Sequence, residues 1–255
     1  MIASMLDCPA IDAFDVQPLS RIVELRQYTL HPGRREALIE LFEREFIESQ
    51  EAVGIELIGQ FRDLDDPDRF VWLRGFAGMP QRKQALEAFY GGPVWKTHRD
   101  AANATMIDSD DVLLLRPAHS RSAFAAAEHR VRSAAPDTGV ILVTIHTLDA
   151  RDPSEFIEFF ERVWTPMLWN ASVAVCGSFV TEWSNNTFPA LPVRADESVF
   201  VWFSTHASAE RASQAQARIQ EALDWSPRVG DEMARHLARP TQVLRLQPTP
   251  RSRLR

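Results

Sequence analysis

Apolar and polar residues alternate along several short stretches of this chain, as they do in β-strands. The clearest stretch is FVWLRGF, residues 70–76, which places Phe70, Trp72, Arg74 and Phe76 on one face. Elsewhere the apolar positions recur every three or four residues, which is the spacing of an amphipathic helix. Over the first half of the chain these patterns predict the order strand, helix, strand, strand, helix, strand, the split βαβ or ferredoxin-like arrangement.

The same phrase returns as FVWFSTH at residues 200–206, 130 residues later, and Trp225 follows this copy as Trp95 follows the first. Upstream of that strand the offset is 118, since FFERVW at residues 159–164 matches LFEREF at residues 41–46. The second copy therefore carries 12 additional residues, within WSNNTFPALPVRAD at residues 183–196. One consistent alignment with one insertion at a turn indicates a tandem duplication.

The duplication divides the chain into parts. A sheet with helices on one face must cover its other face, and two such sheets can cover each other. The predicted fold is therefore α+β, with two ferredoxin-like units forming a pseudo-dimeric α/β barrel within one chain. The expected parts are a flexible N-terminal extension (1–20), the first unit (21–117), a linker (118–138) with an exposed helix over 122–132, a second, divergent unit (139–248) and a solvated basic tail (249–255).

Composition narrows the classes of partner. The 255 residues carry a net charge of −7, so the chain lacks the basic character of a nucleic-acid binder. It has no run of about 18 apolar residues, so no membrane span is expected, and its first twenty residues lack the pattern of a secretory signal. Two cysteines, Cys8 and Cys176, make no disulfide framework. We therefore expect a cytoplasmic protein that binds a small molecule, as a monomer (a pseudo-dimer) or a homodimer.

Five motifs of the first unit carry a family resemblance: ELRQYTLHPG (24–33), LFEREF (41–46), VGIELIGQFRD (53–63), DDPDRFVWLRGF (65–76) and WKTHR (95–99). With these residues the unit resembles the NIPSNAP family. The resemblance implies a dimeric α/β-barrel fold, which is shared by cofactor-independent monooxygenases, haem-degrading enzymes, isomerases and lyases. Fold alone does not choose among these activities. The second unit is less similar, because Leu142, Thr144 and His146 stand where the first has Glu24, Arg26 and Tyr28.

Strand alternation sorts the side chains of each unit into two faces. We expect the more apolar set to pack under the helices: Val23, Leu25, Leu57, Gly59, Val71 and Leu73. We expect the other set to line the seam between the two sheets: Glu24, Arg26, Tyr28, Gln60, Trp72 and Arg74 from the first unit, with Thr144, His146, Cys176, Ser178, Trp202, Ser204 and His206 from the second. A buried arginine needs partners. The seam is then either an ion-pair network that fixes the two halves, or a clamp for an anion or carbonyl in a ligand pocket.

Three further assignments concern histidine and tryptophan. His98, on the short helix after Trp95, is the candidate catalytic base, because imidazole titrates near neutral pH; the alternative is a helix-surface histidine beside Asp100. Trp95 and Trp225 are expected to anchor the core or to line a pocket. His146, His206 and Cys176 share residue types with metal ligands, but their spacing matches no known metal signature, so no metal is assigned.

Two functions follow from these residues. The first is a small-molecule protein whose ligand is planar and apolar with one oxygen function, held by Arg26, Tyr28, Trp72, Arg74, Trp95, His146 and His206. If it is catalytic, His98 abstracts a proton while arginine or tyrosine holds an enolate, in cofactor-free monooxygenation or isomerisation. The second is a non-catalytic interaction or structural protein, or a haem-binding or haem-degrading relative. No cofactor is expected, haem binding is left open, and the sequence does not decide whether the chain is an enzyme.

Overall fold

The computed structural model describes residues 20–125 and 138–255. Both halves have the predicted order of elements. The first half contains β1 (Ile22–Leu30), α1 (Arg35–Leu41), η1 (Phe42–Phe46), α2 (Ile47–Glu51), β2 (Glu56–Asp63), β3 (Arg69–Phe76), α3 (Met79–Gly91), α4 (Pro93–Asn103) and β4 (Met106–Pro117). The second half contains β5 (Val140–Thr147), α5 (Ser154–Phe159), η2 (Phe160–Trp164), α6 (Thr165–Asn170), β6 (Val175–Thr181), β7 (Val199–His206), α7 (Ala209–Trp225), α8 (Pro227–His236) and β8 (Gln242–Pro248).

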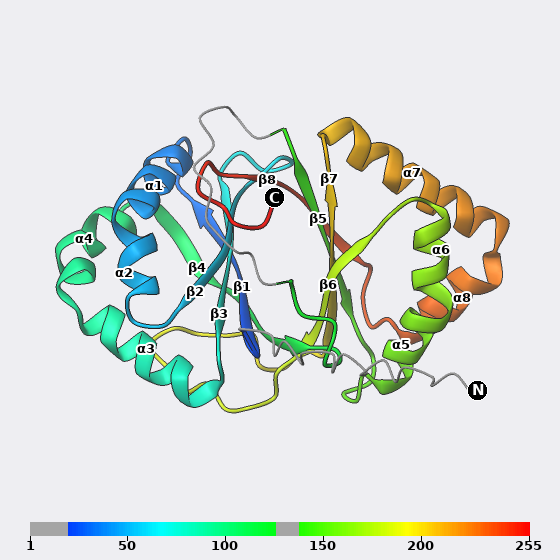
Figure 1. Cartoon of the computed structure of the whole chain (residues 1–255), viewed down its shortest axis with the longest axis horizontal. Coiled ribbons are helices and arrows are strands. Elements are labelled where there is room, and N and C mark those ends of the chain that lie inside the picture. The colour runs from blue at the N-terminus through cyan, green and yellow to red at the C-terminus, as the bar shows by residue number, and fades with distance from the viewer. Residues whose placement is uncertain (1–19, 126–137) are drawn as a thin grey trace, which may run out of the picture.

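The eight strands form one closed antiparallel barrel in the order β1-β3-β2-β8-β5-β7-β6-β4. Each half contributes four neighbouring strands, and the halves join where β2 pairs with β8 and where β4 pairs with β6. Helices α1–α4 cover the outer side of one half of the barrel and α5–α8 cover the other (Figure 1). The fold is thus α+β with an antiparallel sheet, and closure leaves no free sheet edge between the halves.

The same helical irregularity occurs in both halves. The long helical segment after the first strand of each half contains a π-helical turn, η1 at Phe42–Phe46 and η2 at Phe160–Trp164. The two turns lie 118 residues apart, which is the offset that the sequence motifs have in this region. A π-turn shifts the side chains that follow it around the helix axis, so the two helices present their aromatic residues to the sheet in a similar way.

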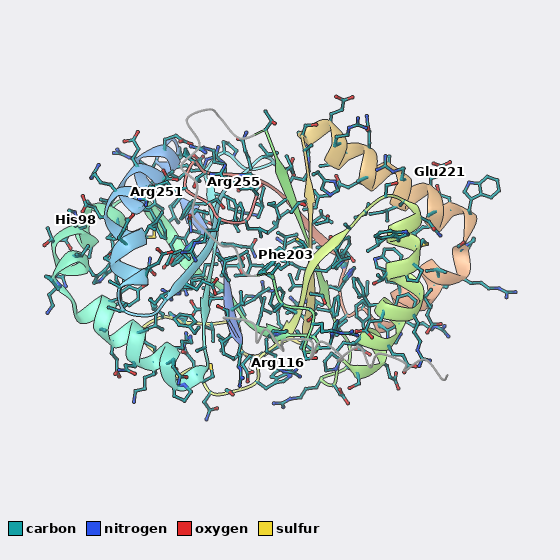
Figure 2. The ribbon with its side chains drawn as sticks, in the orientation of Figure 1. His98, Arg116, Phe203, Glu221, Arg251 and Arg255 are labelled. Atoms are coloured by element: carbon teal, nitrogen blue, oxygen red, sulfur yellow. The ribbon has the colours of Figure 1, made fainter. Side chains whose placement is uncertain are left out.

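The barrel interior is apolar, so the predicted assignment of the two strand faces is wrong. The interior cluster consists of residues from both halves: Val23, Leu25, Ile58, Phe61, Val71, Leu73, Leu113, Leu115, Ile141, Val143, Ile145, Phe179, Val199, Val201, Phe203, Leu244 and Leu246. Figure 2 places Phe203 between the two sheets at the centre of the molecule. Alternation separates two faces correctly, but both faces of this sheet are buried. The pattern therefore does not indicate which face meets the helices. In the structure it is the charged face that meets them.

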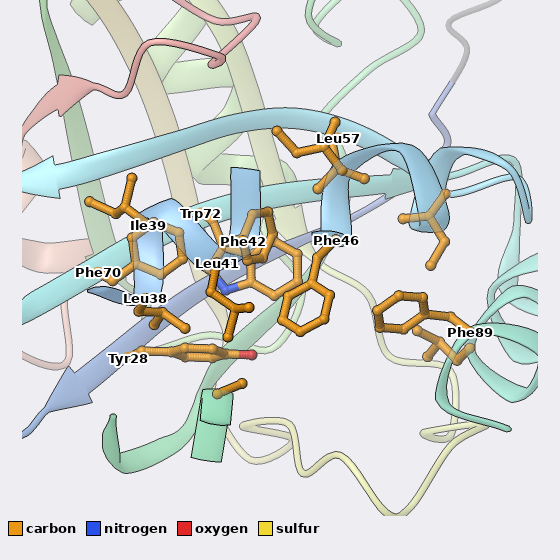
Figure 3. Packing of buried hydrophobic residues seen from close by; sticks show 14 of the residues in the cluster. Tyr28, Leu38, Ile39, Leu41, Phe42, Phe46, Leu57, Phe70, Trp72 and Phe89 are labelled. Carbon is orange, nitrogen blue, oxygen red and sulfur yellow. The ribbon is translucent and has the colours of Figure 1, made fainter. Parts of the chain in front are cut away.

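One residue of the apolar set does lie under the helices as predicted. Leu57 pairs with Arg74, but the next registered pair is Gly59 with Leu73, because β2 has a bulge between Leu57 and Gly59. A bulge changes the alternation of a strand by one residue. Leu57 consequently packs with the helix-side cluster, where Figure 3 shows it near Phe46.

The linker does not form the predicted exposed helix in its described part. Ser122 is buried, and its hydroxyl lies within hydrogen-bonding distance of two backbone oxygens, 3.0 Å from that of His119 and 2.8 Å from that of Ser178. Phe124 inserts against the barrel interior, with its ring centroid 4.8 Å from that of Phe179 and 4.9 Å from that of Phe203. The rest of the expected linker helix, and residues 1–19 of the expected extension, lie outside the described residues.

The prediction of a solvated C-terminal tail is also wrong. The backbone N–H of Thr249 donates to the carbonyl of Gln60, and that of Leu254 donates to the carbonyl of Ile58, each over 2.9 Å. Leu254 packs against the barrel interior. The segment thus continues along β2 after β8 ends (Figure 1).

The arginines of the tail contact acidic residues of the first helical segment. Arg251 pairs with Glu48, and Arg253 lies 3.0 Å from Glu51. The basic composition of this tail predicted a solvated segment. Composition does not show that its acidic partners lie about two hundred positions earlier in the chain. Exposed pairs of this kind contribute little free energy each, so we attribute the docking mainly to the backbone hydrogen bonds and Leu254.

Removing residues 249–255 is therefore expected to lower the free energy of unfolding by about 2–4 kcal/mol, because buried hydrogen bonds and an apolar contact are lost. Urea unfolding followed by tryptophan fluorescence measures this change. Arg253→Ala, which removes the partly exposed ion pairs with Glu51 and Glu56, is the control and should cost less than about 1 kcal/mol. A truncated chain as stable as the full one would contradict the role given to the tail.

Candidate functional site

The polar face of the first half's sheet lies against its helices. In the register of β1 and β3, Glu24 is opposite Arg74, Arg26 is opposite Trp72, and Tyr28 is opposite Phe70. Side chains at alternate positions of a strand share a face, so these residues form one layer. Figure 3 shows part of this layer, with Tyr28 and Trp72 between the strands and the helical segment that carries Phe42.

Glu24 binds three arginines. Its Oε2 atom is 2.7 Å from Arg26 Nη1 and 2.7 Å from Arg74 Nε, and its Oε1 atom is 2.6 Å from Arg82 Nε. All four side chains are at most 1 % exposed. Such short contacts between ionised groups are charge-assisted hydrogen bonds. We call these four residues the arginine cluster.

Arg82 is the member that the sequence analysis missed. It lies in the first turn of α3, and Ala85, Leu86 and Phe89 continue the same helix face at the third, fourth and seventh following positions. All four residues are buried. An arginine on an otherwise apolar helical stripe is a readable signal of a buried charge, and it would have pointed to this residue.

The arginine cluster carries more positive than negative charge. One carboxylate faces three guanidinium groups, which gives a net charge of +2 in a buried place. Burial by itself would raise the pKa of Glu24, but the charges of Arg74, Arg26 and Arg82 outweigh this effect and hold the pKa well below its usual range. Burial, together with repulsion from Arg74 and Arg26, lowers the pKa of Arg82 despite its bond to Glu24. The cluster is therefore short of negative charge.

Several donors of this layer have no acceptor in the part of the chain that the structure describes. Trp72 Nε1, Arg74 Nη2 and Arg82 Nη2 are buried and lack a hydrogen-bond partner among the described residues. They lie close together, because Arg74 and Arg82 flank the same carboxylate and the Arg74 guanidinium carbon is 5.0 Å from the centroid of the Trp72 ring. A buried unsatisfied donor costs about 1–3 kcal/mol. Unpaired N–H groups beside surplus positive charge are what an oxyanion requires.

A loop from the second half covers the arginine cluster. Arg82 Nη1 donates to Asn186 Oδ1 over 3.0 Å and to Thr187 Oγ1 over 3.2 Å. The ring of Phe188 stacks on Tyr90, with centroids 5.6 Å apart and planes at 28°. These residues belong to the insertion 183–196 that the sequence comparison located. The insertion thus forms part of a site whose charges all come from the first half.

Aromatic side chains surround the arginine cluster on the helix side. Tyr90 Oη accepts a hydrogen bond from Arg74 Nη1 at 3.4 Å. The ring of Trp95 lies 4.9 Å from that of Tyr90 and 5.6 Å from that of Phe46, centroid to centroid. Trp95 thus packs on the helix-side cluster, as expected for a core anchor or a pocket wall.

The expectation that Trp225 is a second core anchor is wrong, because its side chain is 83 % exposed. In the first half Gly91 ends α3, and Pro93 starts a new helix that carries Trp95 inward. In the second half α7 continues through Trp225 itself, and α8 begins only at Pro227. The two tryptophans therefore occupy different places relative to the helix break.

His98 lies on the outer side of this aromatic layer. Its Nε2 atom is 3.4 Å from Glu45 Oε2, and its ring centroid is 6.4 Å from that of Phe46. Its side chain is 28 % exposed, and Figure 2 shows it at the outer edge of the helices. The described contact is with Glu45 and not with Asp100. The structure does not bring His98 into contact with the arginine cluster, and its role as a base stays a prediction.

The second half has no equivalent charge set. Leu142, Thr144, Ser204 and Ala212 stand at the positions of Glu24, Arg26, Arg74 and Arg82, and all four are buried. Leu142 and Ala212 pack together with Val140 in an apolar group. The site is therefore present once in the described chain.

The polar residues predicted in the second half are bound to one another in pairs. Trp202 Nε1 donates to His146 Nε2 over 3.2 Å, and His146 Nδ1 is 3.0 Å from Thr241 Oγ1. Burial lowers the pKa of His146 to about 4, so the ring is neutral at pH 7. His206 Nε2 lies 2.9 Å from Ser204 Oγ.

Cys176 packs toward the barrel interior, as predicted for a residue of the seam, but it does not join these histidines, since His146 faces the helices. Burial raises the pKa of its thiol to about 12, so it is a thiol and not a thiolate at neutral pH. No group of three His, Cys, Asp or Glu residues placed to hold a metal occurs in residues 20–125 and 138–255. The residues nominated in the second half thus do not extend the site of the first.

Glu24→Gln is expected to destabilise the fold by about 3–5 kcal/mol, because it leaves three buried arginines without their counter-ion. The pKa of Glu24 is lower in the folded than in the unfolded state. Its contribution is therefore complete above the pKa of an unfolded glutamate, about 4.3, and is lost as the pH falls below that value. The difference in unfolding free energy between the two chains should be constant from pH 7 to about 5 and should shrink below about pH 4.

Urea unfolding at several pH values measures both effects. Glu36→Gln makes the same change in the exposed Glu36–Arg62 pair, whose atoms are 2.6 Å apart, and should cost less than about 1 kcal/mol. Equal costs for the two substitutions would mean that the arginine cluster does not depend on its carboxylate.

The family model that matches this chain is NIPSNAP, over residues 23–121. No curated protein sequence matches the chain significantly. Three solved structures are similar over most of the chain. An anthrone oxidase-like protein has a TM-score of 0.55 and 11 % identity, covering 89 % of this chain and 91 % of its own. A proposed monooxygenase from Fusobacterium nucleatum subsp. nucleatum ATCC 25586 has a TM-score of 0.54 and 8 % identity, covering 89 % and 91 %. A proposed monooxygenase from Lactobacillus acidophilus NCFM has a TM-score of 0.53 and 14 % identity, covering 90 % and 94 %.

At these identities the likeness to the three structures concerns the fold alone. Among the described residues no helix has the length and apolar character needed to cross a membrane. The matched region begins in β1 and ends just after β4, so it contains the whole arginine cluster. It also contains the five motifs on which the family resemblance was based. Residues 23–121 of this chain match the NIPSNAP family model, and we call this region the NIPSNAP domain.

Proposed function

We propose that the NIPSNAP domain of this chain binds a small planar molecule through an ionised oxygen, which takes its place beside the arginine cluster. The observation that carries this proposal is the charge balance of the cluster, one carboxylate against three guanidinium groups, all buried. Burying unbalanced charge is unfavourable. A ligand anion would reduce the imbalance and would accept hydrogen bonds from Trp72, Arg74 and Arg82.

The surroundings of the arginine cluster favour a planar, apolar ligand. Trp72, Tyr90, Trp95 and Phe188 contribute aromatic surface on the helix side of the sheet and on the covering loop. Aromatic side chains pack well against flat ring systems. The ligand we infer is therefore an aromatic or conjugated molecule with a carboxylate, phenolate or enolate group.

The chemistry that suits this environment best is cofactor-free oxygenation, with isomerisation as a second possibility. Guanidinium groups stabilise an enolate or phenolate and so make its formation easier. With anthrone as substrate, the ring carbon opposite the carbonyl loses two hydrogens and gains one oxygen atom from O₂, and the second oxygen atom leaves as water. The anthrone oxidase-like neighbour motivates the choice of this substrate.

His98 is the base that we retain for proton abstraction. Glu24 is poorly suited to this task, because its arginines hold its pKa well below the usual range. Glu45 Oε2, 3.4 Å from His98 Nε2, would orient the imidazole for this task. The ring of Phe46, with its centroid 6.4 Å from that of His98, belongs to the helix-side cluster, so His98 would have to reach the ligand past it.

The residues of the site do not fit haem. Haem iron takes an imidazole, thiolate, thioether or phenolate ligand. The arginine cluster offers guanidinium groups, Tyr28 Oη accepts a hydrogen bond from Arg26 Nε at 3.1 Å, and His98 Nε2 is directed to Glu45. We therefore propose the reaction without haem.

A non-catalytic role is the second candidate, and one observation favours it. The contacts of Arg82 with Asn186 and Thr187 join the two halves of the chain. The arginine cluster would then serve to hold the covering loop on the NIPSNAP domain. In that case the site would bind no anion from solution.

We also infer that the halves are tandem ferredoxin-like copies that take the place of the two subunits of a dimer. The repeated element order, the π-turns 118 residues apart and the barrel closed within one chain support this view. The second copy would have lost the charge set and kept the fold. A monomer is then sufficient for function, and a homodimer would use surfaces other than the barrel.

The binding proposal is tested with 2-naphthoate and its neutral analogue 2-naphthamide, by isothermal titration calorimetry. The carboxylate is expected to bind at least about tenfold more tightly than the amide, because it supplies the missing negative charge. Arg82→Gln should lower the affinity for 2-naphthoate by about tenfold or more, since one charge-assisted hydrogen bond is lost.

Lys83→Gln removes the adjacent positive charge, whose side chain is 57 % exposed, and serves as the matched control. It should leave the affinity within about twofold. Equal affinity for the two naphthyl compounds, or equal effects of the two substitutions, would favour the non-catalytic role.

The catalytic proposal is tested by oxygen uptake and anthraquinone absorbance with anthrone as substrate. His98→Ala is expected to lower the rate by a factor of about 10²–10⁴, which is the usual contribution of a general base. His119→Ala alters another histidine that is paired with a glutamate, Glu161 at 3.1 Å, and should have no effect. Oxidation that persists at full rate in His98→Ala would remove His98 from the mechanism.

A further inference from the structure

The loop that covers the arginine cluster is fixed at one end and touches the cluster with its tip. Near its end, Arg194 Nη1 lies 3.0 Å from Asp111 Oδ1, and the Arg194 N–H donates to the carbonyl of Val112. At its tip, Asn186 and Thr187 meet Arg82. The turn that the first half has between β2 and β3 is short, residues 64–68. The long loop thus belongs to the second half, which lacks an arginine cluster, and reaches the first half, which has one.

Asn186 places a neutral oxygen where the arginine cluster favours an anion. Its Oδ1 atom accepts from Arg82 Nη1 at 3.0 Å and from the N–H of Phe188, also at 3.0 Å. An amide oxygen carries only a partial negative charge, so this contact leaves the surplus charge of the cluster uncompensated. A carboxylate or phenolate oxygen on the same donor would make a stronger hydrogen bond.

We propose that Asn186 occupies the position on Arg82 that the ligand's ionised oxygen takes, so that this loop determines which ligands the NIPSNAP domain accepts. This inference rests on the proposed function and adds the residue with which the ligand competes. Phe188 follows two positions later and stacks on Tyr90. The loop tip therefore presents an oxygen on Arg82 and an aromatic ring on Tyr90.

The tip resembles an aryl carboxylate or a phenolate in its contacts. A ligand that replaces both groups needs an ionised oxygen and a flat ring in one molecule. An aliphatic anion would replace the contact with Arg82 but not the stacking on Tyr90, and a neutral arene would do the reverse. The ligand class that displaces the tip most effectively is thus an aromatic anion.

The test compares Asn186→Asp with Asn185→Asp, which makes the same change at the adjacent, exposed residue. An aspartate at position 186 retains the acceptor for Arg82 and adds the negative charge that the ligand would bring, while it loses the hydrogen bond that Asn186 Nδ2 donates to the carbonyl of Leu191 over 2.8 Å. Asn186→Asp is expected to lower the affinity for 2-naphthoate by about tenfold or more and to leave the affinity for 2-naphthamide unchanged. Asn185→Asp should change neither affinity by more than about twofold. Calorimetry on the full chain gives these ratios.

A second readout needs no ligand. Asn186→Asp is expected to raise the Tm at pH 7 relative to Asn185→Asp, because its charge-assisted bond to Arg82 contributes more than the neutral hydrogen bond to the carbonyl of Leu191 that is lost. The arginines would lower the folded-state pKa of that carboxylate, so the gain should be present above about pH 5 and lost as the pH falls below about 4.

The outcomes separate the two proposals. If 2-naphthoate binds the unaltered chain and Asn186→Asp behaves like Asn185→Asp in affinity and Tm, the inference about the loop is overturned and the proposed function stands. If 2-naphthoate does not bind but Asn186→Asp raises the Tm, the proposed function fails for this ligand class while Asn186 is supported as the occupant of an anion position. If neither effect is seen, both proposals fail.

Discussion

The bond between the Glu24 carboxylate and the guanidinium groups of Arg26, Arg74 and Arg82 is the interaction on which the first half depends. It joins two neighbouring strands to helix α3, and through Arg82 it reaches Asn186 in the loop from the second half. Ionised groups can be buried only where other charges and hydrogen bonds compensate for lost water. Here the compensation is incomplete, and this imbalance separates the site from an ordinary structural ion pair.

The two halves of the barrel contribute different parts of the site. The NIPSNAP domain has the charged layer, whereas the second half has apolar or small residues, such as Leu142 and Ala212, at corresponding positions. The second half supplies the other wall of the apolar barrel interior and the loop that covers the first half's site. A half that has no charge set of its own therefore still shapes the surroundings of the one that does.

Sequence pattern predicted the element order, the position of the insertion and the family of the first half, because periodicity, turns and repeated motifs are local signals. It failed for the orientation of the sheet, since alternation separates Glu24 from Leu25 without indicating which of two buried faces meets the helices. The helical stripe that Arg82 shares with Ala85 and Phe89 signals that this arginine is buried, but it does not identify its partners. Glu24 lies 58 positions away in sequence and Asn186 more than one hundred. The docked C-terminal segment was mistaken for a solvated tail for the same reason, as its contacts with Glu48 and Glu51 are long-range.

Closure of the barrel within a single polypeptide has a consequence for how this site can change. In an assembly of two identical subunits, every substitution occurs in both subunits. A substitution that improves the loop covering one site must therefore also be tolerated at the equivalent position of the other subunit. One gene that encodes both sides removes that constraint. Variation at Asn186 or Phe188 alters a single cover over a single site, and selection can adjust it without touching the residues beneath.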